Sequence, residues 1–286
     1  MMHFRSAKGA ARTAIRIRNC FATHSVLREF LGKVALVFAG TVLCVALAQA
    51  DDRRVPVIVE LFTSEGCSSC PPADGLLARL ERTQPVVGAR IIALEEHVDY
   101  WNQLGWIDPF SSPQYRARQN DYALAFHVDS VYTPQMVVNG GAAFIGDDQN
   151  RAYQEIAMAA QAQGTVLDLR ADNNVRDPEL VDLSVRVNNL KVAKLRDANV
   201  YLAVTENELV SKVSRGENSG RLLRHAAVVR RFGVIGRIDP RGATAGQIVS
   251  TLRVPREWRR ENLRAVVFVQ ERESFRITGA GIIDLR

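Results

Sequence analysis

Cysteine is scarce in this chain, with four among 286 residues, and this scarcity excludes a scaffold held together by many disulfides. Ten prolines and nineteen glycines are too few for a collagen-like or low-complexity chain. Hydrophobic residues make up 47% and charged residues 24%, a balance typical of a globular protein and not of a disordered one. The length allows one large domain or two of ordinary size.

The N-terminal segment has the pattern of a secretory signal peptide. Seven basic side chains and one acidic side chain lie in residues 1–33, and an uncharged, largely apolar run follows over residues 34–47. The run is closed by Ala48-Gln49-Ala50, the small-x-small exit that precedes cleavage. It is shorter than the roughly 20 residues of a membrane span, although an uncleaved anchor helix is the alternative. We predict cleavage after Ala50, a mature chain without a stable membrane span, and a periplasmic or secreted location.

The charge balance changes once this leader is set aside. The whole chain has 37 basic and 31 acidic side chains, of which seven and one lie in residues 1–50, so 30 of each remain. A basic face for nucleic acid is therefore not expected, and we predict no nucleic-acid partner. Residues 51–164 hold 15 acidic and 8 basic side chains, and residues 165–286 hold 15 and 22. This division predicts two complementary surfaces that pack on each other, with a polyanion site on the second half as the alternative.

Residues 51–164 alternate strand-like and helix-like segments. The β-branched run from Val55 to Phe62 is typical of a strand buried on both faces, and Asn139-Gly140 is a strong signal for a hairpin turn. Strands are predicted at 55–62, 86–94 and 135–138. Helices are predicted to open at Pro71-Pro72, to open at Pro113 behind a Ser111-Ser112 cap, and to span 147–163. This order predicts an α/β domain.

The helical signals become sparse after residue 164. Apolar and polar side chains alternate over 181–187, 200–204, 265–269 and 277–285, a pattern typical of half-buried strands. We therefore predict three parts: a signal peptide over 1–50, an α/β domain over 51–164, and a small antiparallel β-sandwich-like domain over 165–286.

One pair of cysteines remains in the predicted mature chain, in Cys67-Ser-Ser-Cys70, and it lies between a buried strand and a helix. The unpaired amides and partial positive charge of a helix N-terminus stabilise a thiolate at the first cysteine. The second sulfur, one turn away, can resolve a mixed disulfide within the chain. We predict that Cys67 is the attacking sulfur, more exposed and more reactive, and that Cys70 is the resolving sulfur.

A second segment supports this interpretation. Thr133-Pro134 directly precedes the predicted strand that ends at Asn139-Gly140. In thioredoxin-type folds a cis-proline at this place lies against the dithiol, and the backbone of its neighbour pairs with the substrate peptide. Cis bonds occupy only about 5–6% of the bonds before proline, so the fold pattern and position, and not the proline alone, predict a cis bond at Pro134.

Three sequence blocks resemble a secreted bacterial thioredoxin-like family catalogued as domain of unknown function 1223. They read VELFTSEGCSSCPPAD over 59–74, HVDYWNQLGWIDPF over 97–110 and VYTPQMVVNG over 131–140. The resemblance implies a thioredoxin-like domain with an inserted helical segment, followed by a β-rich domain, but it implies no particular reaction. The chain departs from the family pattern at Glu95-Glu96, where apolar residues are more usual, directly before His97.

Other side chains are candidates for roles beside the cysteines. His97 and Asp99 follow the second strand, at the end of an α/β sheet where functional groups gather; His97 is either a proton shuttle or metal ligand, or a structural residue. Glu60 is either a buried carboxylate that relays protons to the dithiol, or an edge residue that faces water. We expect no role for His127 and His225.

The aromatic residues near this edge also allow two interpretations. They form either a peptide-docking surface or, as is more usual, part of the core around an inserted helix. The residues concerned are Tyr100, Trp101, Trp106 and Phe110.

Three classes of function remain. The favoured one is a thiol–disulfide oxidoreductase that acts on exported protein thiols or a redox partner and needs no cofactor, with Cys67, Cys70, Thr133 and Pro134 at its site. The second is a copper-binding protein that uses Cys67, Cys70 and His97, because thiolates favour Cu(I). The third is a binding module with a structural disulfide, but a bridge that closes so short a loop stabilises little.

Overall fold

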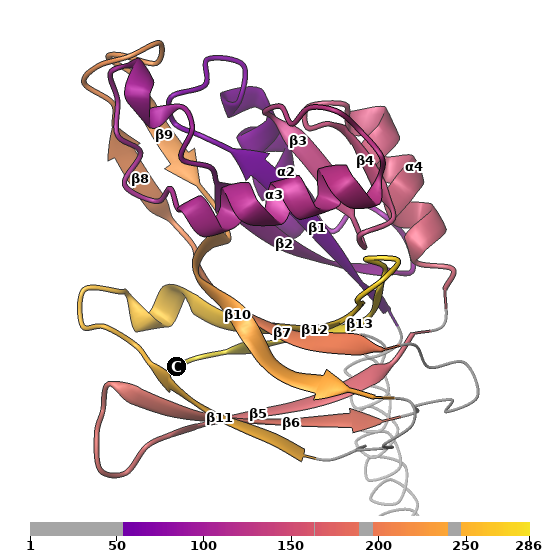
Figure 1. Cartoon of the computed structure of the whole chain (residues 1–286). Helices are drawn as coiled ribbons and strands as arrows, with labels where there is room; N and C mark the ends of the chain where they lie inside the picture. The colour runs from indigo at the N-terminus through magenta and orange to yellow at the C-terminus, as the bar shows by residue number, and fades with distance from the viewer. Residues whose placement is uncertain (1–53, 163, 189–196, 240–246) are drawn as a thin grey trace, which may run out of the picture. The chain divides into compact units, whose positions relative to one another are not determined.

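The structure, a computed structural model, describes residues 54–162, 164–188, 197–239 and 247–286. Its largest element is a mixed sheet of eight strands in the order β13-β12-β7-β10-β2-β1-β3-β4 (Figure 1). The strands are β1 (Val55–Thr63), β2 (Ala89–His97), β3 (Gln135–Val138), β4 (Ala142–Ile145), β7 (Ala198–Glu206), β10 (Val228–Ile238), β12 (Leu263–Glu271) and β13 (Ile277–Asp284). The predicted leader lies outside the described residues, so the signal peptide and its cleavage site stay predictions.

Strand β1 lies between two partners, which is why its sequence is almost wholly apolar. It pairs in parallel with β2, from Val55 beside Ala89 to Thr63 beside His97, and antiparallel with β3 on its other side. The predicted strand over 55–62 is therefore confirmed. Strand β2 runs on through His97, past the predicted end at residue 94; the side chains of its last three residues are buried, and Glu95 and His97 have polar partners there.

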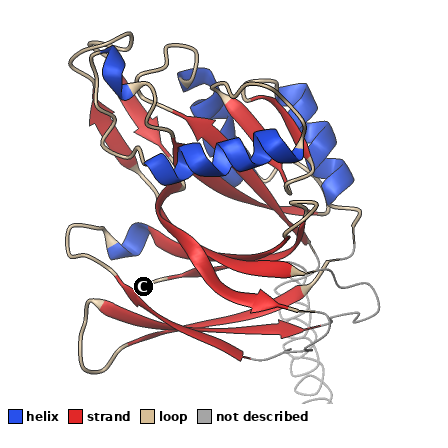
Figure 2. Ribbon diagram, in the orientation of Figure 1, coloured by secondary structure: helices blue, strands red, loops and turns tan. Residues whose placement is uncertain are grey.

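Helices cover both faces of this part of the sheet, as Figure 2 shows. The helices are α2 (Pro71–Thr83), α3 (Pro113–Ala125) and α4 (Gln149–Ala159). Leu77 of α2 and Ile156 of α4 belong to one apolar core with Val59, whereas Tyr122 of α3 belongs to another with Phe62. Of the helices in the described ranges, none is long and apolar enough to cross a membrane.

Local signals place the starts of α2 and α3 and the hairpin as predicted. Ser112 caps α3 by accepting a hydrogen bond from the amide of Gln114, and a proline occupies the first turn. Strands β3 and β4 pair antiparallel around Asn139-Gly140, which confirms the predicted hairpin. Helix α4 spans 149–159, shorter than the predicted 147–163, and its cap is Asp148.

The remaining strands form two smaller sheets. A three-stranded sheet has the order β11-β6-β5, and a two-stranded hairpin joins β8 to β9. Their bounds are β5 (Val166–Asn173), β6 (Leu180–Asn188), β8 (Leu209–Lys212), β9 (Leu222–His225) and β11 (Gln247–Arg253), and two short 3-10 helices lie at η2 (Asn102–Leu104) and η4 (Arg260–Asn262). Side chains of β6 pack with those of β7 and β12 in one apolar core.

The large sheet crosses the position at which the sequence predicts a domain boundary. Val228 of β10 pairs in parallel with Glu95 of β2, so strands from both sides of residue 164 share one sheet. Residues 54–286 also group as a single compact unit. The fold is mixed α/β with few helices, and the division into an α/β domain and a separate β-sandwich-like domain stays a prediction.

Candidate functional site

The two cysteines lie in the turn between β1 and α2. Cys67 and Cys70 are joined by a disulfide, and Cys70 is the N-cap residue of α2 with Pro71 in its first turn. Both cysteines have no exposed area, whereas Ser68 and Ser69 between them are exposed. The prediction that Cys67 is the more exposed sulfur is therefore wrong.

A loop distant in sequence explains this burial. The β8–β9 loop, residues 213–221, lies against the cysteine turn: the side-chain amide of Asn218 donates to the carbonyl oxygens of Glu65 and Cys67, both at 2.9 Å. The amide of Ser68 donates to the Glu217 carboxylate at 3.1 Å. Arg221 holds Asn218 in this orientation by donating to its side-chain oxygen at 2.6 Å. The loop thus fixes the backbone on both sides of the first sulfur.

Replacing Asn218 by alanine is expected to speed reduction of the Cys67–Cys70 disulfide by dithiothreitol about tenfold. The change removes two buried hydrogen bonds of about 0.7 kcal/mol each, and the resulting change of about 1.4 kcal/mol in the equilibrium for loop opening is a factor of ten. The rate is followed by alkylating free thiols at timed intervals and separating the species on a gel. Asn188→Ala, which removes a bond from β6 to Asp168, is the matched control; equal rates in both variants would contradict the covering role of the loop.

The Thr133–Pro134 segment lies at the same edge of the sheet. Its peptide bond is cis, as predicted. The indole N–H of Trp101 donates to the Thr133 hydroxyl at 2.8 Å, and a Cβ at Gly66 would stand 3.0 Å from the Trp101 Cβ. Trp101 therefore links Thr133 to the residue that precedes Cys67.

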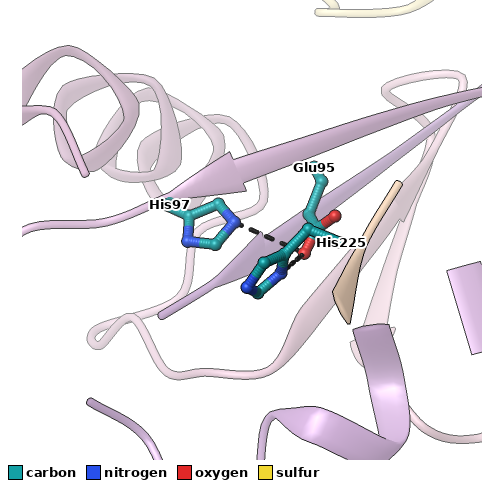
Figure 3. Close-up of side chains that lie close together, drawn as sticks. All are labelled: Glu95, His97 and His225. Carbon is teal, nitrogen blue, oxygen red and sulfur yellow. Dashed lines mark hydrogen bonds and ion pairs between the residues drawn. The ribbon is translucent and has the colours of Figure 1, made fainter. Parts of the chain in front are cut away.

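Five buried side chains beside the cysteine turn form what we call the histidine–carboxylate cluster: Glu65, Glu95, His97, Asp108 and His225. Nδ1 of His97 lies 2.7 Å from Oδ2 of Asp108, and Nδ1 of His225 lies 2.8 Å from Oε1 of Glu95. Nε2 of His225 lies 3.1 Å from Oε1 of Glu65. Figure 3 shows the two imidazole rings converging on the Glu95 carboxylate; their centroids are 4.9 Å apart.

These neighbours shift the pKa values of the cluster in opposite directions. Burial disfavours a charge on His97, but the Asp108 carboxylate outweighs this and raises the pKa of His97 well above its ordinary value. Against the same penalty of burial, Glu95 raises the pKa of His225 to about 9. Burial alone would raise the pKa of Glu95, but His225 lowers it to about 2. The carboxylates of the cluster therefore favour the protonated, positively charged form of both histidines.

A further acid lies close to this cluster. Asp74, in the first turn of α2, accepts a hydrogen bond from the Thr63 hydroxyl at 2.6 Å. Burial raises the pKa of Asp74 to about 7, and the negative charge of Glu95 adds to the increase. This carboxyl group titrates near neutral pH at the start of the helix that Cys70 caps.

Glu60 lies on the opposite face of the sheet from this cluster. Its carboxylate accepts hydrogen bonds from Nε of Arg118 and from the Tyr122 hydroxyl, both at 2.5 Å. The residue is fully buried, so the interpretation as a water-facing edge residue is wrong. Its contacts are with α3 and not with the cysteine turn.

The aromatic residues near the site have internal partners. Trp106 donates to Oε2 of Glu65 at 2.7 Å, and Phe110 packs edge-on against His97 and His225. Tyr100 donates to Gln119. These contacts fit the interpretation as structural packing around the inserted segment.

Sequence reasoning missed several residues of the site, among them Glu65, Asp108 and His225; for His225 it expected no role. His225 lies 128 residues after His97, at the end of β9, and no spacing or motif connects the two. The candidate Asp99, by contrast, is not part of the histidine–carboxylate cluster. Its carboxylate lies 3.4 Å from Nε of Arg116. Glu95, at which the chain departs from the pattern of the resembled family, accepts a hydrogen bond from His225.

One set of potential metal ligands occurs among the described residues: Glu95, His97 and His225, with one donor atom from each lying within 4.8 Å of the others. The cysteines are not in this set. Their sulfurs are bonded to each other, and a disulfide sulfur is not the thiolate that binds Cu(I). The copper set of Cys67, Cys70 and His97 stays a prediction for the reduced protein.

Fold and site together define a mixed α/β protein with a disulfide at a strand-to-helix turn and a buried histidine–carboxylate cluster beside it. The chain belongs to the family described as protein of unknown function (DUF1223), whose family model matches residues 58–270. No relative is found among curated proteins.

Solved structures that resemble this chain include one from Agrobacterium tumefaciens and one from Porphyromonas gingivalis. Protein AGR_C_4864 from Agrobacterium tumefaciens has 26% identity and a TM-score of 0.62, with 82% of this chain and 96% of that chain covered. HBP35 of Porphyromonas gingivalis has 14% identity and a TM-score of 0.57, with 81% and 76% covered, so its likeness concerns the fold alone.

Proposed function

We propose that this chain is an exported thiol–disulfide oxidoreductase with a thioredoxin-like fold, and that Cys67 and Cys70 exchange with thiols of exported proteins. The observation that carries the proposal is the Cys67–Cys70 disulfide at the turn from β1 into α2. A bridge over so short a loop contributes only about 2 kcal/mol by loop-closure entropy, less than the roughly 3 kcal/mol of a 15-residue loop. Stability alone is therefore a weak reason for its presence.

The strand arrangement supports the thioredoxin-like interpretation. Strands β2, β1, β3 and β4 combine a parallel pair with an antiparallel hairpin, and helices cover both faces. Phe62 pairs with Gln135, so the cis-proline that precedes Gln135 lies where β1 ends, a few residues before Cys67. A dithiol at a strand-to-helix turn, with a cis-proline at the start of the neighbouring strand, is the arrangement of thioredoxin-type sites.

The proposed reaction is a two-electron exchange. A substrate thiolate attacks Sγ of Cys67, the bond between the two cysteine sulfurs breaks, and Cys70 leaves as a thiolate. A second substrate thiolate then attacks the mixed disulfide, so the substrate leaves oxidised and the cysteine pair remains reduced. The reverse sequence reduces or rearranges a substrate disulfide, and the relative potentials of the two partners set the direction. Access to Cys67 requires the β8–β9 loop to move aside.

Replacing Cys70 by serine is expected to trap the chain on its substrates. The variant keeps the attacking Cys67 thiol but lacks the sulfur that resolves the mixed disulfide, so covalent complexes accumulate. Non-reducing gels of the exporting host, probed for this chain, should show bands of higher mass that disappear with reductant. The Cys67→Ser/Cys70→Ser variant is the control and should show none.

Two results would contradict the proposal. One is the absence of any trapped complex in the Cys70→Ser variant when it is exported at the level of the wild type. The other is retention of one equivalent of copper by the reduced wild type, lost in the double serine variant, since this would favour the copper-binding alternative.

A further inference from the structure

We propose that Glu95, His97 and His225 form a binding site for one divalent transition-metal ion, with Zn²⁺ as the ion that the donor set fits. The site is separate from the two cysteines, so it stands or falls independently of the proposed redox function. Its residues come from the end of β2 and the end of β9.

Two of the three distances between donor atoms are near those of a coordination sphere, and the donor atoms of the set all lie within 4.8 Å of one another. Oε1 of Glu95 lies 2.8 Å from Nδ1 of His225 and 3.3 Å from Nε2 of His97. Bonds of about 2.1 Å to zinc give a tetrahedral edge of roughly 3.4 Å, so small movements of the side chains would admit an ion. All three residues are buried, with at most 4% of their area exposed.

One donor atom is incompletely satisfied by its neighbours. Nε2 of His97 is fully buried and makes no hydrogen bond, although it lies 3.3 Å from the Glu95 carboxylate (Figure 3). A buried polar nitrogen that makes no hydrogen bond carries part of the penalty of about 1–3 kcal/mol of an unsatisfied group. A metal ion bound by this nitrogen would remove the penalty.

The groups behind the donors have the arrangement found around metal-binding histidines. The second ring nitrogen of each histidine faces a carboxylate: Asp108 for His97 and Glu65 for His225. Such pairs fix the orientation of the ring and increase its basicity as a ligand. The free oxygen of Glu95 accepts a hydrogen bond from the amide of Ala226 at 2.9 Å, which holds the third donor in place.

The chemistry of the donors selects the ion. Two imidazoles and a carboxylate suit Zn²⁺, whereas Mg²⁺ and Ca²⁺ prefer oxygen donors and Cu(I) prefers thiolates. The carboxylates of Glu65, Glu95 and Asp108 can balance the divalent charge in a buried site. A bound ion would also join β2 to β9 and so hold in place the β8–β9 loop that covers Cys67.

Zinc binding is tested on the purified protein after removal of metals with a chelator. Titration with Zn²⁺ against a chromophoric competitor should show one equivalent bound by the wild type. His225→Gln and Glu95→Gln should each weaken binding by about 100-fold, at or beyond the upper end of the losses seen when only a supporting residue is changed. His127→Gln, at an exposed histidine outside the cluster, is the matched control and should bind as the wild type does.

The cysteine double variant separates this site from the redox site. Cys67→Ser/Cys70→Ser should keep its zinc, so loss of zinc in that variant would overturn the proposal without bearing on the trapping experiment. Because a buried substitution can disturb folding, the wild type is also loaded with Co²⁺, whose spectrum should show tetrahedral nitrogen and oxygen ligation without a thiolate charge-transfer band. A thiolate band, no stoichiometric zinc in the wild type, or undiminished binding by both variants of the ligands would overturn it.

Discussion

Replacing Arg118 by methionine is expected to lower the free energy of unfolding by about 3–5 kcal/mol, because it leaves a buried carboxylate without its counter-charge. Nε of Arg118 donates to Glu60, and the guanidinium also lies 3.6 Å from Glu96. Burial and the charge of Glu60 raise the pKa of Glu96 well above its ordinary value, so Glu60 is the carboxylate that Arg118 balances. Urea unfolding followed by circular dichroism measures the loss.

The aromatic surroundings of Arg118 add to this effect. Its guanidinium carbon lies 4.7–5.5 Å from the centroids of four rings, an arrangement that favours a desolvated cation. The rings are those of Tyr122, Tyr201, Phe232 and Phe268. Methionine fills part of the volume but supplies no charge, so the packing of α3 against β7 and β10 weakens as well.

Two further variants isolate the charge effect. Arg116→Met removes an arginine of the same helix that is half exposed and lies 3.4 Å from Asp99, and it should cost less than about 1 kcal/mol. Glu60→Gln combined with Arg118→Met removes both charges, and this double variant should regain at least about 1 kcal/mol relative to Arg118→Met alone. A double variant as unstable as the sum of its single changes would show that packing, and not the unpaired carboxylate, dominates.

The end of β2 supplies both buried polar clusters because side chains alternate along a strand. Glu95 and His97 point to the face that holds His225, whereas Glu96 points to the face that holds Arg118. A strand that ends in three consecutive ionisable residues would ordinarily be expected to stop in solvent. Here it continues because Glu95 and His97 meet oppositely charged groups on one face, whereas Glu96, whose pKa burial raises, lies 3.6 Å from Arg118 on the other.

Local signals were sufficient to predict the elements that carry the cysteines. The apolar run of β1, the prolines that open α2 and α3, and the Asn139-Gly140 turn each depend on residues close together in the chain, and all are confirmed. The resemblance to the family is confirmed as well. The cis bond at Pro134 was predicted from its place in this order of elements.

The parts of the site that were not predicted depend on contacts between residues far apart in the chain, which no local pattern encodes. Asn218 is 151 residues from Cys67 in the chain and His225 is 130 residues from Glu95, yet each contributes hydrogen bonds to the site. The expectation that Cys67 is exposed came from its assigned role as the attacking sulfur, and it is wrong because the segment that covers it, residues 213–221, is distant in the chain.

Replacing Gly140 by alanine is expected to lower the free energy of unfolding by about 3 kcal/mol. Its φ of +61° would cost an alanine about 1–2 kcal/mol, and the new Cβ would stand 2.0 Å from the carbonyl oxygen of Phe275, which must then move. That oxygen accepts a hydrogen bond from Gln270, whose side chain also contacts Arg118. The displacement therefore extends to the buried Glu60 and Arg118 side chains. These lie on the face of the sheet opposite to the cysteine turn.

Gly88→Ala is the matched control because it has the same backbone conformation without the obstruction. Gly88 has a φ of +82°, but nothing lies within 4 Å of a Cβ built there, so only the conformational cost of about 1–2 kcal/mol applies. Urea unfolding of both variants gives the difference, which measures the close contact between the β3–β4 turn and Phe275. Equal losses would show that this contact can be relieved without a cost in free energy.

If the contact is as rigid as its backbone atoms imply, Gly140→Ala and Arg118→Met should also combine non-additively in the free energy of unfolding, since both disturb Gln270.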